Sequence, residues 1–66
     1  GGTAACTINA ANDMAVAAFL AGKIGYTDIV KVIEKTLGAV DFVPEPSVED
    51  LVGVNAEARK FAATLL

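Results

Sequence analysis

The sequence has no histidine, no tryptophan and a single cysteine, Cys6, in 66 residues. One cysteine cannot form an internal disulfide, and a chain without histidine is a poor candidate for a zinc site. Low cysteine usage is typical of reducing compartments, so we expect a cytoplasmic setting. The sequence begins with glycine rather than methionine and ends in two leucines, which we take as signs of a fragment of a larger protein.

Basic residues are also few, with five lysines and arginines against eight acidic residues and a net charge of −3. They are scattered along the chain and form no basic patch. We therefore expect neither nucleic acid nor an anionic membrane as a partner. Apolar runs are shorter than the roughly 20 residues that a membrane-spanning helix needs.

Proline occurs only at Pro44 and Pro46. Elsewhere the apolar residues follow helical spacing, and no segment has the alternation of a strand. The sequence predicts an all-α fold, a small helical bundle of three to four helices that resembles an incomplete four-helix bundle. We expect these helices over residues 4–21, 28–40, 48–52 and 56–66 of one domain.

The segment 8–21 is the expected centre of this bundle. It is apolar on every side from Met14 onward, and such a helix requires cover all round. Its many alanines favour the helix and keep it thin, so that neighbouring helices can approach closely. Gly22 is the expected residue after its C-terminus, because glycine readily takes a positive φ.

The second helix has the clearest apolar stripe, which recurs with a period of 3.6 residues. Thr27 is the expected N-cap, and Asp28 suits the positive end of the helix. The stripe consists of Ile29, Val32, Ile33, Thr36, Leu37 and Val40.

The residues after the linker 41–46 contain a capping signal, Ser47 followed by Asp50. Aspartate is shorter than the usual glutamate, so we expect only half of the reciprocal capping box. Gly53 then predicts an early end to this helix. Asn55 is the expected cap of a separate last helix.

Five short motifs or single residues could suggest a functional site, but we do not assign one to any of them. Gly22-Lys23-Ile24-Gly25 matches the GXXG loop of KH domains, but it also fits a helix end and a turn. Glu49 and Asp50 are neighbours on a first helical turn, so they point apart rather than toward one substrate. Ser47 has no histidine to activate it, and Cys6 has no basic neighbour to lower its pKa. Gly1-Gly2 lacks the GK[ST] sequence of a phosphate-binding loop.

The residues Asn9, Asn12 and Asp13 are the candidates for a domain interface. Asparagine disfavours helix interiors, because its side chain competes for backbone hydrogen bonds. Two explanations stay open. Either Asn9 caps a helix that starts late, or the amides bind a neighbouring segment outside this chain.

Five segments together carry a resemblance that spans nearly the whole chain. They are Asn9-Ala10-Ala11-Asn12-Asp13, Ala15–Gly22, Ile24–Ile29, Glu45–Leu51 and Asn55-Ala56-Glu57-Ala58-Arg59. With these segments the chain resembles the C-terminal helical domain of the 1-deoxy-D-xylulose 5-phosphate reductoisomerase family. The family pattern usually has glutamate where Asp13 stands, proline where Ala5 stands and aspartate where Asn55 stands.

The resemblance implies a parent enzyme of the non-mevalonate isoprenoid pathway, an NADPH-dependent homodimer in the bacterial cytoplasm. It also implies that NADPH and a divalent metal (Mg, Mn or Co) are bound by domains outside this chain. No catalytic, cofactor-binding or metal-binding residue of the family maps onto these 66 residues. The implied role is therefore a non-catalytic domain that supports the catalytic domain, and we expect the fragment alone to be inactive.

The alternative is a free-standing helical interaction module that shares the pattern. In either case Val16, Phe19 and Leu20 point in different directions around the first helix, so we expect at least one of them to stay exposed. An exposed apolar surface favours self-association of the isolated chain.

Overall fold

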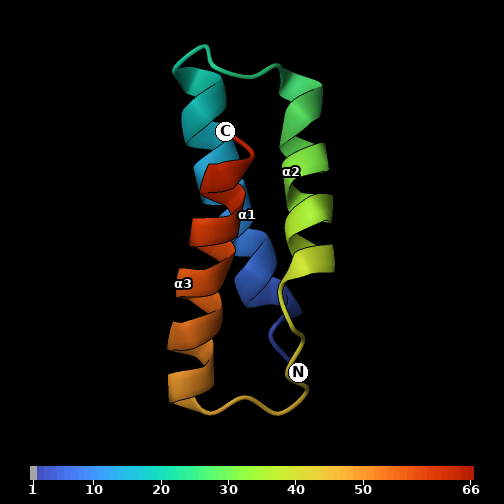
Figure 1. Ribbon diagram of the computed structural model, residues 1–66, viewed down its shortest axis with the longest axis vertical. Coiled ribbons are helices and arrows are strands. Elements are labelled where there is room, and N and C mark those ends of the chain that lie inside the picture. The colour runs from blue at the N-terminus through green and yellow to red at the C-terminus, as the bar shows by residue number, and fades with distance from the viewer. Residues whose placement is uncertain (1) are drawn as a thin grey trace.

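The fold is known from a computed structural model, which describes residues 2–66; the Gly1 part of the Gly1-Gly2 motif lies outside them. The described residues form three helices and no strand, so the predicted all-α fold is confirmed. The helices are α1 (Ala4–Leu20), α2 (Tyr26–Ala39) and α3 (Val48–Thr64). Figure 1 shows them side by side in an elongated body of 36 × 16 × 16 Å.

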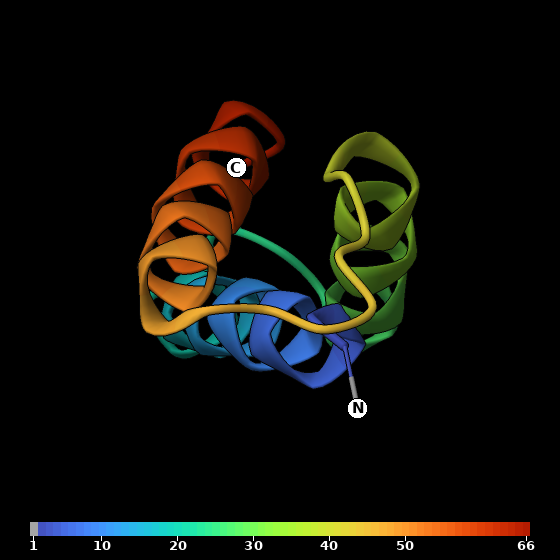
Figure 2. The same ribbon diagram turned by 90° about the horizontal axis from the view of Figure 1, so that it is seen from below.

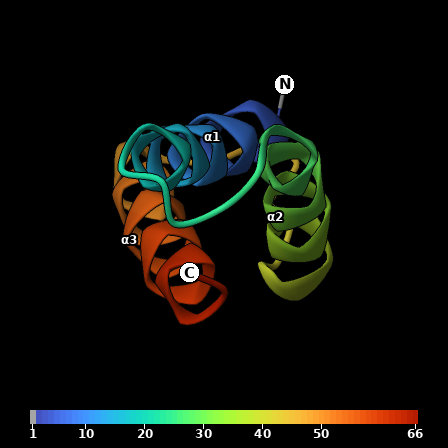
Figure 3. The same ribbon diagram turned by 90° about the horizontal axis from the view of Figure 1, so that it is seen from above.

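Helix α1 forms one layer, and α2 and α3 lie together on the same side of it (Figures 2 and 3). Both helices pack along α1, whereas they meet each other only sparsely. Within the described residues, α1 is therefore covered on one side only. Its side opposite α2 and α3 has no helix against it.

Alanine makes up most of the core between the three helices. Six of the nine buried apolar residues are alanines and the other three are valines. Small side chains allow helix backbones to approach closely. They also bury little apolar surface, so hydrophobic burial within this chain contributes modestly to stability. The buried apolar residues are Ala10, Ala11, Ala15, Ala18, Ala58, Ala62, Val32, Val40 and Val54.

The C-terminus of α1 confirms the predicted role of Gly22, which has a φ of +76°. The N–H of Lys23 donates to the carbonyl of Ala18 at 2.9 Å, and the N–H of Gly22 donates to that of Phe19 at 3.0 Å. These two bonds define a Schellman motif. The GXXG match to KH domains is thus a helix end followed by a turn, in a chain whose described residues include no strand.

The start of α2 differs from the prediction. The N-cap is Gly25 rather than Thr27, and the helix begins at Tyr26 rather than at residue 28. The carboxylate of Asp28 accepts the N–H of Gly25 at 2.8 Å. Because Asp28 bonds back to the cap from the third helical position, Tyr26 and Thr27 are drawn into the first turn.

Helix α3 corrects the sequence prediction most strongly. Residues 48–52 and 56–66 do not form two helices, because α3 runs without a break through Gly53 and Asn55. The capping box at its start is also complete rather than half formed. The N–H of Asp50 donates to the Ser47 hydroxyl, and the Asp50 carboxylate accepts the N–H of Ser47, both at 3.0 Å.

The chain before α1 is fastened to the linker between α2 and α3. Thr3 is buried, and its hydroxyl accepts the N–H of Val43 at 2.9 Å. Gly2 has a φ of +85°, and a side chain there would overlap the ring of Phe42. These contacts hold the linker beside the first turn of α1.

Candidate functional site

The side chains of Asn9 and Asn12 are exposed on the uncovered side of α1. Asn9 is not an N-cap, because α1 begins five residues earlier at Ala4. The interpretation of Asn9 as the cap of a late helix is therefore wrong. The other explanation, that the amides bind a segment outside this chain, stays a prediction.

Asp13 has a partner within the chain. Its carboxylate accepts a hydrogen bond from the Arg59 guanidinium at 3.0 Å, which links α1 to α3. The Arg59 Nε donates to the Asn55 side-chain oxygen at 3.1 Å.

The spacing of Asn55 and Arg59 could have suggested their contact, because residues four apart meet on a helix. Nothing local could have suggested Asp13, which lies 46 residues from Arg59 in sequence. This pair is exposed to solvent, so it contributes about 0–1 kcal/mol. It orients the two helices rather than forming a reactive centre.

The side chains that were weighed as catalytic candidates have structural roles instead. The Ser47 hydroxyl and the Asp50 carboxylate are the two halves of the α3 capping box. The Cys6 thiol lies 3.6 Å from the Leu51 carbonyl and packs against buried Ala10 and its neighbours. Cys6 is thus a packing residue, as predicted.

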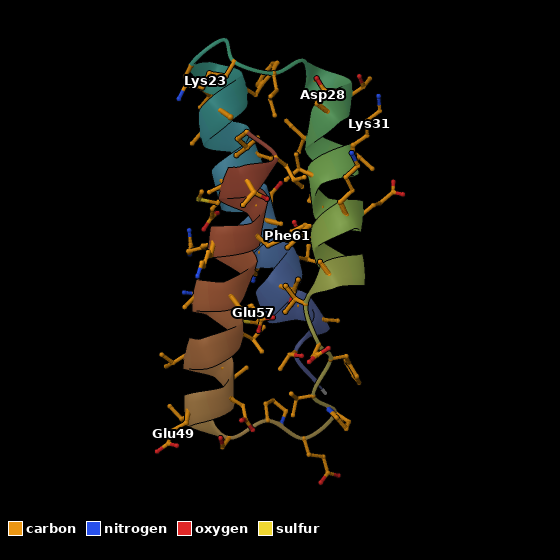
Figure 4. The ribbon with its side chains drawn as sticks, in the orientation of Figure 1. Lys23, Asp28, Lys31, Glu49, Glu57 and Phe61 are labelled. Atoms are coloured by element: carbon orange, nitrogen blue, oxygen red, sulfur yellow. The ribbon has the colours of Figure 1, made fainter. Side chains whose placement is uncertain are left out.

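The labelled charged side chains are distributed along the body rather than gathered (Figure 4). Lys23, Asp28 and Lys31 lie toward one end, whereas Glu49 lies at the opposite end. Asp28 and Lys31 are 3.8 Å apart, as neighbours on α2. Residues 2–66 contain no group of three side chains that could hold a metal ion.

A hollow lies between the C-terminal end of α2 and α3. Figure 4 shows Phe61 of α3 and, below it, Glu57. The surface of the hollow is mainly apolar. Its lining residues are Ala39, Val40, Glu57, Lys60, Phe61 and Thr64.

The fold and the side chains define a class, that of small helical domains in which few large apolar residues are fully buried. Alanine fills the interior, whereas ten large apolar side chains are exposed. None of the helices described is long and apolar enough to cross a membrane.

Comparison with known proteins gives the family. The model of the DXP reductoisomerase C-terminal domain matches residues 1–61, and the chain belongs to this family. The resemblance found in the sequence is thereby confirmed. No solved structure matches the chain.

Several relatives carry the name 1-deoxy-D-xylulose 5-phosphate reductoisomerase. The protein of Phocaeicola vulgatus is 46% identical over 98% of this chain. Those of Bacteroides fragilis and Zymomonas mobilis are 46% and 47% identical over all of it. The chain spans 17% of the length of each of these three relatives.

Proposed function

We propose that this chain is the non-catalytic C-terminal domain of an NADPH-dependent 1-deoxy-D-xylulose 5-phosphate reductoisomerase of the bacterial cytoplasm, and that it supports the catalytic domain. The similarity to reductoisomerases over nearly the whole chain carries this proposal. The parent enzyme would rearrange its substrate and reduce the product with NADPH and a divalent metal.

The residues present here do not fit either cofactor. Nicotinamide nucleotides bind at a glycine-rich turn between a strand and a helix, whereas the glycines 22 and 25 flank a connection between two helices. A divalent metal needs several converging oxygen ligands, and the described residues include no such group. We therefore derive no catalytic step in this chain and assign both cofactors to the remainder of the parent polypeptide.

The first test is the coding sequence upstream of residue 1. A strand, a GxGxxG turn and a helix some hundreds of residues earlier support the parent enzyme. An upstream sequence without a nucleotide-binding segment favours the free-standing module instead.

The second test is an assay of the parent polypeptide with 1-deoxy-D-xylulose 5-phosphate, NADPH and Mn²⁺. We expect substrate-dependent oxidation of NADPH. Replacing the acidic pair by the variants Glu49→Gln and Asp50→Asn should leave kcat unchanged. A large loss of kcat in a variant that stays folded would place chemistry in this chain and contradict the proposal.

A further inference from the structure

The linker 41–46 between α2 and α3 is held at both of its ends. Val40, just before it, is buried in a cluster with residues of α1 and α3. Ser47, just after it, caps α3. Pro44 and Pro46 stiffen the backbone in between, because the proline ring fixes φ. The linker is therefore a stiff strap rather than a loose loop.

This strap lies against the chain that leads into α1. Figure 2 shows the linker crossing the start of α1 on its way to α3. The Thr3 hydroxyl accepts the N–H of Val43 at 2.9 Å, which is the first contact between them. The second contact is that of the Phe42 ring with Gly2. We call these four residues the clasp.

Gly2 and Phe42 fit each other in a way that excludes a side chain at position 2. The φ of Gly2 is +85°, which residues with a side chain rarely adopt. A Cβ at this position would also overlap the Phe42 ring. Because Phe42 is 61% exposed, burial in the core does not account for the position of its ring. The ring instead packs on the chain that enters α1.

We propose that the clasp is a positioning device, which sets the direction in which the parent polypeptide enters this domain. The inference rests on the proposed function, because a C-terminal domain receives its chain from the domains before it. Each residue of a chain has two soft backbone angles, φ and ψ. Fixing residues 2 and 3 against a strap that is anchored beside α2 and α3 removes the rotations through which the entering chain would swing.

The two contacts of the clasp have different consequences. Thr3 is 1% exposed, so its hydrogen bond is part of the bundle and supports the stability of the fold. Phe42 lies at the surface, where substitutions usually change stability little. Removing its ring should therefore release the entering chain while the three helices stay folded. Phe42 is thus the positioning residue of the clasp.

Hydrogen exchange in the full-length parent, followed by mass spectrometry, tests the proposal. We expect Phe42→Ala to accelerate amide exchange about tenfold in the peptides that contain residues 2–3 and the linker, but not in α2 or α3. Phe42→Tyr keeps the ring and should restore slow exchange. The control is Val52→Ala, at an exposed position of α3, which should change neither region. Unchanged exchange in Phe42→Ala would overturn the proposal. Equal acceleration in all three helices would overturn it too, because Phe42 would then only stabilise the bundle.

A double-mutant cycle tests whether positions 2 and 42 act on each other in the parent. Gly2→Ala places a methyl group where the Phe42 ring lies, and Phe42→Ala removes the ring. In the double variant the overlap is relieved and only the unfavourable φ remains. We expect its melting temperature to fall by less than the sum of the two single falls. Additive falls would show that the two positions are not in contact and would contradict the clasp.

These results are separable from the proposed function. A parent that reduces its substrate but shows no effect of Phe42→Ala on exchange keeps the function and rejects the clasp. Accelerated local exchange in a parent without reductoisomerase activity keeps the clasp and rejects the function.

Discussion

The Thr3 hydroxyl holds the linker between α2 and α3 against the start of α1. It accepts the N–H of Val43 across 40 residues of sequence and fastens the linker to the start of α1. Thr3→Val keeps the shape but leaves the Val43 N–H without its partner. We expect the free energy of unfolding to fall by about 1–3 kcal/mol.

Urea melts followed by circular dichroism measure this loss. Thr27→Val is the matched control, because Thr27 is exposed on the first turn of α2. Its effect should stay within about 0.5 kcal/mol. Equal melting of the two variants would mean that the linker is not held by Thr3.

We expect Asn12→Ala to change the free energy of unfolding in opposite directions in the isolated chain and in the parent polypeptide. In the isolated chain it is exposed, and alanine is the better helix former, so Asn12→Ala should stabilise by a few tenths of a kcal/mol. In the parent polypeptide the same change should cost about 1–3 kcal/mol, since it orphans a buried partner. Denaturant melts of both proteins check the reversal. A neutral or stabilising effect in the parent would make Asn12 a solvated residue only.

At the scale of the helices, the sequence pattern predicted where apolar helices lie, but it predicted their first and last residues less well. The stripe on α2 is largely confirmed, with Val32, Thr36 and Val40 buried and Leu37 partly exposed. The cap of α2 was misplaced, because the Asp28 side chain reaches back to Gly25. Such a bond depends on a rotamer that residue types alone do not specify.

The predicted break in α3 failed for a tertiary reason. A helical glycine costs about 1 kcal/mol relative to alanine. Val54, Ala58 and Ala62 on the same helix are buried, and this packing outweighs the local penalty. Asn55 does not cap a new helix, because its side chain binds Arg59 instead.

Gly53→Ala tests the continuity of α3 directly. Apart from the chain neighbours and the backbone of α3 itself, no atom lies within 4 Å of where the added Cβ would stand, and α3 is helical on both sides of this residue. We therefore expect the substitution to stabilise the chain by about 0.5–1 kcal/mol. Thermal melts measure the change.

Gly22→Ala is the control for this prediction. Gly22 also has open space around it, but its φ of +76° is unfavourable for alanine. It should destabilise where Gly53→Ala stabilises. A destabilising Gly53→Ala would favour two helices with a break between them.

For the whole molecule, the sequence predicted an all-α bundle and an apolar side chain left exposed on the first helix. Leu20 confirms the second point at 77% exposure. The sequence could not reveal which side of α1 is open, because that depends on both neighbours packing on one side. The interface role of Asn9, Asn12 and Asp13 stays a prediction, and the structure gives Asp13 a partner inside the chain.

We also predict that the isolated 66-residue chain self-associates into a dimer or a higher oligomer through the side of α1 opposite α2 and α3. Covering about 400 Å² on each chain gives a gross gain of about 20 kcal/mol per dimer before the association costs. Apolar contacts are insensitive to salt screening. Sedimentation at several concentrations, with and without about 1 M NaCl, should show the same oligomer. A monomer at about 100 μM would contradict this prediction, because it would show that the three helices form a stable core without a partner chain.

We propose above all that this chain supports a catalytic domain and carries no chemistry of its own. Calorimetric titration of NADPH and of Mn²⁺ into the parent polypeptide and into the isolated chain tests it most directly. We predict saturable heats for the parent and none for the isolated chain. Micromolar binding of NADPH or Mn²⁺ to the isolated chain would show instead that these 66 residues form a binding site of their own.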